Sequence, residues 1–104
     1  MKRGEIRKYK FNKPDKQRPV LILTRDSIIE YLNEVTVAPI TTTIRDIPTE
    51  VLLTKETDGM DVDCCINFDH IQTVPKSKIG GLKTTLPALK YNEVKKALLF
   101  ALGF

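Results

Sequence analysis

The sequence predicts a mainly β (α+β) fold in which a series of short strands is followed by one helix near the C-terminus. Three observations support this prediction. Short segments rich in β-branched and apolar residues alternate with turn-forming residues along most of the chain. One of them, residues 20–23, is apolar at every position, which is typical of a central strand covered on both faces. The last segment instead repeats apolar residues at helical spacing.

The individual elements are predicted in chain order. Four strands are expected, at residues 4–11, 19–25, 34–42 and 49–54. Residues 26–32 are expected to form one or two helical turns. Residues 60–68 alternate between apolar and polar side chains, which predicts a half-buried strand that continues to residue 74 and ends at Pro75. The terminal helix is expected over about 87–102, with Gly103 as its stop.

Length and composition bound the domain organisation. The chain has 104 residues, of which 41% are hydrophobic and 29% charged. This is an ordinary globular composition, and the length corresponds to a single domain over residues 1–104. No apolar run approaches the roughly 18 residues that a membrane helix needs, and the N-terminal residues lack the apolar stretch of a secretory signal. We therefore expect a cytoplasmic protein with no membrane partner.

The cysteines and the histidine predict neither a disulfide nor a metal site. Cys64 and Cys65 are adjacent, and neighbouring residues on a strand point to opposite faces, so they are poorly placed to bridge each other. With one histidine and no C-x-x-C motif, the chain lacks the usual four ligands of a structural zinc ion. No metal and no cofactor are predicted.

Positive charge is concentrated at the N-terminal end. The net charge is +4, but residues 1–18 carry eight Lys and Arg against two acidic residues, so the rest of the chain is slightly negative. A concentrated basic segment attracts a polyanion such as nucleic acid. Tyr9 and Phe11, interleaved with the lysines, could stack on bases. A solvated basic strand gives the same pattern, and the charge alone leaves both interpretations open.

Two polar side chains flank apolar strands in a way that suggests phosphodiester chemistry. Arg18 and Pro19 precede the apolar run at residues 20–23, and Thr41 follows the run at residues 35–40. A guanidinium can hold two phosphate oxygens, and a hydroxyl can donate a hydrogen bond to a third or position the nucleophile. Together they are the pair that metal-free cleavage of RNA needs.

Five fragments occur in order between residue 3 and the C-terminal end: RGE at 3–5, RPVL at 18–21, APIT at 38–41, DHIQTVPKS at 69–77, and the tail 93–103. Together they resemble the MazF/PemK toxins of bacterial toxin–antitoxin systems. The resemblance implies a small SH3-like antiparallel β-barrel of the PemK/CcdB type with a C-terminal helix, and a homodimer. It also implies a sequence-specific, metal-independent endoribonuclease that cuts single-stranded RNA and is neutralised by a cognate antitoxin.

The resemblance also assigns roles to residues. Arg18 and Thr41 fall on the family's catalytic arginine and threonine. Attack by the 2′-hydroxyl would leave a 2′,3′-cyclic phosphate or 3′-phosphate and a 5′-hydroxyl, with Arg18 stabilising the charge on phosphorus. The residues expected to bind substrate or to assist are Lys16, Pro19, Thr42, Asp69, His70 and Gln72.

Several positions depart from the family pattern or keep two interpretations. Asp69 is expected either to orient Arg18 or accept a proton, or to be a surface carboxylate in an ion pair. His70 titrates near neutral pH, and it stands where the family more often has glutamine. Gln72 stands where the family more often has arginine, so the cutting sequence stays open. The connection at 12–17 is shorter than the family's loop over the RNA groove.

Two other functions share the predicted fold. CcdB toxins use the same barrel and dimer to bind DNA gyrase without catalysis, and an SH3-like barrel can also serve as a non-catalytic nucleic-acid-binding module. The motifs around Arg18 and Thr41 favour the nuclease, and the basic N-terminal segment favours a nucleic acid over a protein target.

Overall fold

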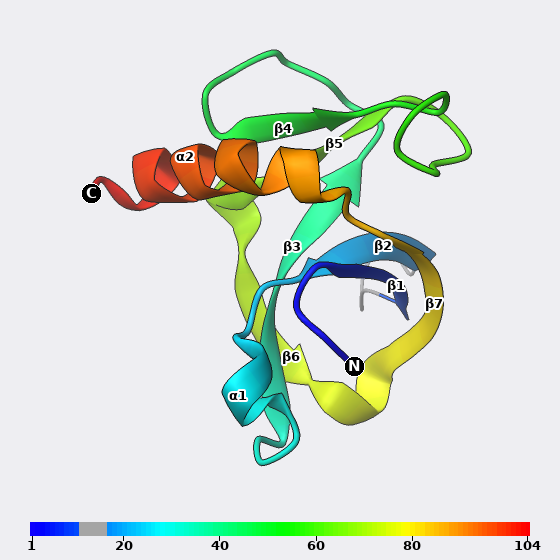
Figure 1. Cartoon of the computed structure of the whole chain (residues 1–104), viewed down its shortest axis with the longest axis vertical. Helices are drawn as coiled ribbons and strands as arrows, with labels where there is room; N and C mark the ends of the chain where they lie inside the picture. The colour runs from blue at the N-terminus through cyan, green and yellow to red at the C-terminus, as the bar shows by residue number, and fades with distance from the viewer. Residues whose placement is uncertain (11–16) are drawn as a thin grey trace.

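The computed structural model describes residues 1–10 and 17–104; the predicted turn at 12–15 and the expected substrate-binding residue Lys16 lie outside the described residues. The elements, in chain order, are β1 (Glu5–Lys10), β2 (Gln17–Ile22), α1 (Asp26–Ile29), β3 (Glu34–Thr41), β4 (Glu50–Leu53), β5 (Cys64–Asn67), the 3-10 turn η1 (Phe68–His70), β6 (Gln72–Pro75), η2 (Lys76–Lys78), β7 (Ile79–Thr85), η3 (Ala88–Lys90) and α2 (Tyr91–Leu102). The predicted class, antiparallel β with a C-terminal helix, is confirmed (Figure 1).

The strands form one antiparallel, strongly curved sheet. Its order is β4-β5-β3-β2-β1-β7, and β6 pairs with β3 on the same edge as β5. Figure 1 shows β1, β2 and β7 curling together on one side while α2 lies across the opposite end beside β4 and β5. Within the described residues no ladder joins β4 to β7, so the sheet curves in the manner of a barrel without closing.

Each face of the central strands packs into a different hydrophobic cluster. On β2, Leu21 belongs to the cluster beneath α2, whereas Val20 and Ile22 belong to the cluster on the other face, near α1. All three side chains are almost fully buried. The prediction of a central strand covered on both faces is confirmed for residues 20–22, because β2 lies between β1 and β3. Its bounds differ from the predicted 19–25, since β2 begins at Gln17 and ends at Ile22.

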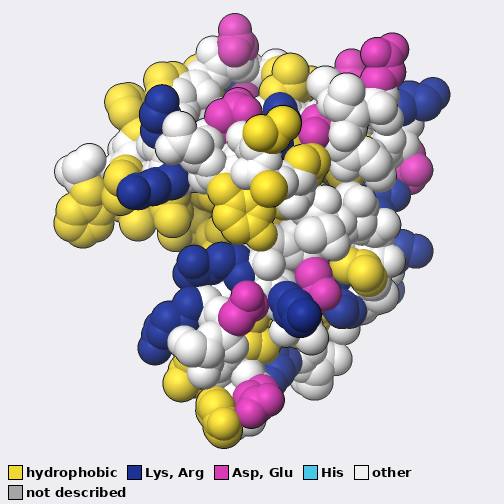
Figure 2. Space-filling model, viewed as in Figure 1, with side chains coloured by type: hydrophobic (Ala, Val, Ile, Leu, Met, Phe, Trp, Pro, Cys, Tyr) yellow, Lys and Arg dark blue, Asp and Glu magenta, His cyan; other side chains and the backbone are white. Residues whose placement is uncertain are grey.

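Helix α2 covers one end of the sheet. Its predicted start was too early, because residues 88–90 form the turn η3 and the α-helix begins at Tyr91. It ends as predicted at Gly103, which adopts φ 80° and so needs the freedom of glycine. Ala97 is buried, and its neighbours on the same stripe pack against the core. The C-terminal end instead exposes apolar side chains, which gather at that end of the helix in Figure 2: Leu99, Phe100, Leu102 and Phe104.

The strand predicted at residues 60–68 is wrong in its first half. Only Cys64–Asn67 is extended, and all four residues are buried, because β5 lies between β3 and β4. Residues 54–63 form a loop instead. The Asp58 carboxylate accepts a hydrogen bond of 2.7 Å from the Thr54 N–H, and Gly59 turns the chain at φ +75°. Side-chain bonds to the backbone of this kind compete with strand formation.

Two further differences come from long-range pairing. The predicted continuation to residue 74 is interrupted by η1, although both halves pair with β3 and Pro75 ends β6 as expected. Strand β7 was not predicted, because its sequence contains Gly80, Gly81 and a polar run, which do not favour a strand. It forms because it pairs with β1. No helix in the described part of the chain combines the length and the apolar character that crossing a membrane would take.

Candidate active site

Antiparallel pairing brings the start of β2 beside the end of β3. The register pairs Val20 with Pro39 and Leu21 with Ala38. Continued by two residues, this register places Arg18 opposite Thr41. Two residues that are more than twenty positions apart in the sequence are therefore brought together by the strands to which they belong.

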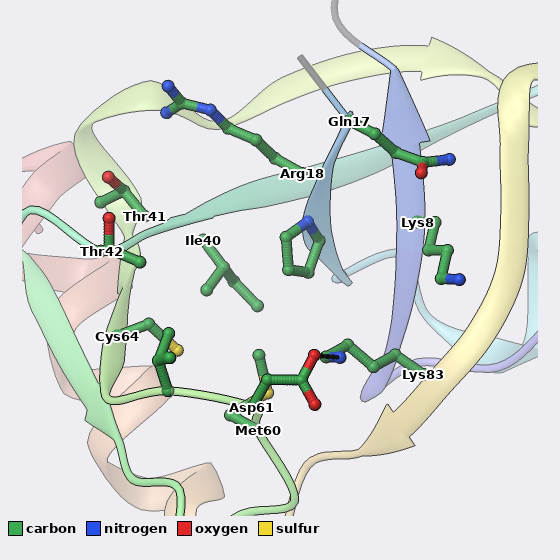
Figure 3. Close-up of a pocket in the computed structure, with 12 residues that line it drawn as sticks. Lys8, Gln17, Arg18, Ile40, Thr41, Thr42, Met60, Asp61, Cys64 and Lys83 are labelled. Carbon is green, nitrogen blue, oxygen red and sulfur yellow. Dashed lines mark hydrogen bonds and ion pairs between the residues drawn. The ribbon is translucent and has the colours of Figure 1, made fainter.

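Arg18, Pro19, Thr41 and Thr42 line one cavity of about 260 Å³. Figure 3 shows the two threonines together on one side of this cavity, with the Arg18 side chain extending over the same side. Sites for drug-sized ligands usually start at about 300 Å³. This smaller, open hollow suits an extended chain that crosses it better than a compact metabolite.

Cationic side chains surround the cavity. Arg18 is half-buried, and among the described residues its guanidinium makes no hydrogen bond or ion pair. Lys8 on β1 and Lys83 on β7 also line the hollow, and Lys83 pairs with Asp61 at 2.6 Å. The hydrogen bond from Lys83 holds the pKa of Asp61 below its usual value. Among the described lining residues, three cations and one carboxylate give the hollow a net positive charge, which attracts phosphate.

The Thr41 hydroxyl is held by the backbone of the following loop. Its oxygen accepts a hydrogen bond of 3.1 Å from the Thr43 N–H. A hydroxyl that accepts one such bond still carries its own proton. Thr41 can therefore donate to an anion in the cavity while its oxygen is kept in place.

The cavity also contains a thiol, which the sequence analysis did not connect to the site. Cys64 lines its floor and is only 3% exposed. Burial, aided by the nearby Asp63 charge, raises the Cys64 pKa to about 11, and burial raises the Cys65 pKa equally far. Both thiols are free, as expected. At neutral pH they are protonated and unreactive, so neither acts as a nucleophile.

Asp69, His70 and Gln72 lie outside this cavity. Asp69 accepts a 2.7 Å hydrogen bond from the Thr49 hydroxyl, and its N–H donates to the Asn67 side chain. Gln72 pairs with Val37, four residues before Thr41 and thus about 13 Å along β3. His70 is exposed at the end of η1. Within the described residues, Asp69 makes no contact that would orient Arg18.

Lys8, Lys83 and Asp61 are charged residues of the cavity that were not predicted from the sequence. Lys8 was counted as part of the basic N-terminal segment, but its place in the cavity was not predicted. Lys83 lies on the unpredicted β7, and Asp61 lies on the loop that had been expected to be a strand. In residues 1–10 and 17–104, no three His, Cys, Asp or Glu side chains are grouped so as to hold a metal ion.

Residues 2–102 match the family described as PemK-like, MazF-like toxin of type II toxin–antitoxin system. Among curated proteins, the chain is similar to the probable endoribonuclease MazF2 of Mycobacterium tuberculosis, with 33% identity over 103 residues that cover 99% of each chain. Among solved structures, Mycobacterium tuberculosis toxin MazF-mt6 superposes with a TM-score of 0.88 at 35% identity, covering 96% of this chain and 97% of the other. An endoribonuclease in complex with its cognate antitoxin from Mycobacterial species gives a TM-score of 0.88 at 26% identity, covering 100% of this chain and 96% of the other.

Proposed function

Because the chain belongs to the family of PemK-like, MazF-like toxins of type II toxin–antitoxin systems, we propose that it is an endoribonuclease that cuts single-stranded RNA without a metal ion. The observation that carries the proposal is the cavity in which the Arg18 guanidinium, with no hydrogen bond or ion pair to the described residues, stands near the held Thr41 hydroxyl. The similar proteins named endoribonucleases support the same activity.

The proposed reaction uses the substrate's own 2′-hydroxyl as nucleophile. Its oxygen attacks the adjacent phosphorus and loses its proton to water, the bond from phosphorus to the 5′-oxygen breaks, and the 5′-oxygen takes a proton from water. The products are a 2′,3′-cyclic phosphate and a 5′-hydroxyl. Arg18 holds two non-bridging oxygens while charge builds on phosphorus, and Thr41 donates a hydrogen bond to the same group. The described cavity lining contains no histidine. Catalysis is therefore assigned to charge stabilisation and orientation rather than to an imidazole base.

The remaining predicted residues take supporting roles in this proposal. Pro19 fixes the backbone after Arg18, and Thr42 lines the cavity beside Thr41. His70 and Gln72 are exposed outside the cavity, on the edge of β3 that carries η1 and β6, where they contact nucleotides that flank the scissile one. Asp69 supports η1 through its bond to Thr49 rather than acting on the scissile group.

The decisive experiment is to incubate the purified protein with a long single-stranded RNA in EDTA and to analyse the fragment ends. Fragments with 5′-hydroxyl ends are expected, and Arg18→Ala should abolish them while the protein stays folded, because Arg18 makes no hydrogen bond or ion pair to the rest of the described chain. Intact RNA with the wild-type protein would overturn the proposal. A gyrase-binding toxin or a non-catalytic binding module would give that result.

The partners proposed for the toxin are a cognate antitoxin and a second copy of the chain, in the cytoplasm, where its RNA is found. An endoribonuclease of the same fold has been solved with its cognate antitoxin. In this chain, an acidic antitoxin segment would cover the cationic cavity and exclude RNA. The second copy is proposed to pack on the exposed apolar end of α2, which adjoins a hollow lined in part by Leu23, Leu32 and Leu98.

A further inference from the structure

The loop at residues 54–63 has a defined structure that fixes where Asp61 stands. At the start of the loop, the Asp58 carboxylate accepts a hydrogen bond of 2.7 Å from the Thr54 N–H. At its end, the Asp63 carboxylate accepts a hydrogen bond of 2.9 Å from the Lys55 N–H. Between them, Gly59 lies so close to β7 that a Cβ atom there would stand 2.7 Å from the Thr84 hydroxyl, and Met60 is buried in the core. These contacts therefore fix the position of Asp61, the residue that follows Met60.

That place is the rim of the cavity that holds Arg18. The Asp61 carboxylate meets the Lys83 ammonium at 2.6 Å, and Figure 3 shows the pair across the cavity from the Arg18 side chain. Asp61 is 84% exposed and Lys83 only 20%. The pair therefore consists of a lysine held in the cavity wall and a carboxylate that faces solvent.

A carboxylate that pairs with a lysine makes the same kind of contact as a phosphate oxygen, because both are anionic acceptors for the hydrogen bonds of the ammonium group. Any RNA that crosses the cavity brings its own anion to this rim. Two anions cannot both take the short contact with Lys83 without repelling each other. The exposed ion pair is weak, because water and salt screen it, so it can be exchanged.

We propose that Asp61 is a built-in competitor for RNA: its carboxylate occupies Lys83 in the free protein, and an RNA phosphate must displace it to bind there. This inference rests on the proposed function, since it concerns the same cavity. It assigns Lys83 to phosphate binding and Asp61 to restraining RNA affinity. Asp61 is thus a positioning residue that acts through Lys83 and takes no part in the chemical step.

The test is a double-mutant cycle on RNA binding. The variants are Asp61→Asn, Lys83→Gln and the two combined, with Asp63→Asn as the matched control. The control removes one negative charge from the same loop and retains an oxygen that can accept the Lys55 N–H. The probe is a random-sequence single-stranded RNA pool with methylated 2′-hydroxyls, which cannot be cut. Steady-state cleavage of an unmodified long RNA supplies kcat and KM.

Asp61→Asn is expected to tighten binding about threefold to tenfold, because Lys83 is released and a repulsive charge is lost. Its KM should fall while kcat stays unchanged. Asp63→Asn should change affinity by about twofold or less, since Asp63 lies outside the cavity lining. Lys83→Gln should weaken RNA binding. Adding Asp61→Asn to Lys83→Gln should restore little of the lost affinity.

Three outcomes would overturn the inference. Affinity that is unchanged or weaker in Asp61→Asn would show that Asp61 does not compete with RNA. An equal gain in Asp63→Asn, or a full gain in the Lys83→Gln background, would show a general charge effect that does not act through Lys83. If the wild-type protein neither binds the modified pool nor cuts RNA, the proposed function fails together with the inference. If the wild type does both and only the Asp61 result is negative, the inference alone fails.

Discussion

Arg18 and Thr41 owe their closeness to the ends of two antiparallel strands, and their local contacts differ in a useful way. The Thr41 oxygen is held by the Thr43 N–H, whereas Arg18 makes no hydrogen bond or ion pair within the described chain. A fixed hydroxyl costs little reorganisation when charge develops. An unpaired guanidinium keeps its donors for the substrate.

Cleavage should require the hydroxyl group of Thr41 but not its methyl group. Thr41→Ser is expected to retain most of the kcat, because it keeps both the proton and the oxygen that accepts from Thr43. Thr41→Val should lose about a hundredfold in kcat, in the range seen when one donor to a developing anion is removed. It should also lose about 1 kcal/mol of stability with the lost hydrogen bond. Cleavage rates and urea unfolding measure both effects; a fully active Thr41→Val would remove Thr41 from the mechanism.

The two buried thiols should make stability fall at alkaline pH. Burial raises both pKa values from 9.0 to about 11. Because each folded value is above the unfolded one, the stability that the protonated thiols contribute is complete below about pH 9 and is lost as the pH rises to about 11. Urea unfolding midpoints across this range should therefore fall more steeply for the wild type than for the Cys64→Ser/Cys65→Ser variant. Equal slopes in the two proteins would contradict the assignment.

At the scale of single residues, the sequence predicted candidate site residues whose neighbours lie on regular strands. Arg18 and Thr41 each adjoin an apolar run and match the family's motifs, and antiparallel pairing brings their two strands together. Lys83 and Asp61 were missed because their positions depend on a strand and a loop that are set by tertiary contacts. Asp69 was left open between a role at the site and a surface ion pair, and no local pattern predicted its hydrogen bond from Thr49.

At the scale of elements, the strongest patterns predicted best. The apolar β2 and the amphipathic α2 are each explained by their own sequence, since burial on two faces or on one stripe leaves a clear signature. The alternation at residues 60–68 predicted a strand that is absent from its first half, because short polar side chains in the loop form hydrogen bonds with nearby backbone groups. Strand β7 has weak intrinsic preference and forms because β1 offers it an edge.

The loop at residues 54–63 should be sensitive to one added methyl group. Gly59→Ala would place a side chain at φ +75° and 2.7 Å from the Thr84 hydroxyl, so we expect a loss of about 1–3 kcal/mol. Gly81→Ala is the matched control, because a Cβ there meets nothing within 4 Å and its effect should stay below about 1 kcal/mol. Urea unfolding of the two variants measures the difference, and similar stabilities would show that the close approach to β7 carries no constraint.

At the scale of the whole molecule, a cationic cavity and an exposed apolar surface occupy different places. The cationic cavity lies at the start of β2 and the end of β3, whereas the exposed apolar side chains lie at the C-terminal end of α2. Contiguous exposed apolar side chains often mark a contact with another chain. The apolar side chains gathered at the C-terminal end of α2 in Figure 2 are therefore the surface on which we propose that a second copy packs.

The proposed self-association makes a prediction for the end of α2. Phe100 is 61% exposed, so Phe100→Glu should leave the fold intact while placing a charge inside any contact made there. A stable interface needs about 800 Å² per partner. The chain exposes 6581 Å² in all, so the contact would take roughly an eighth of its surface. Leu89→Glu is the control, because Leu89 is 92% exposed and precedes α2 at its other end. Sedimentation equilibrium should show a dimer for the wild type and for Leu89→Glu, and a monomer for Phe100→Glu. A wild-type monomer, or a dimer that survives Phe100→Glu, would place the contact elsewhere or remove it.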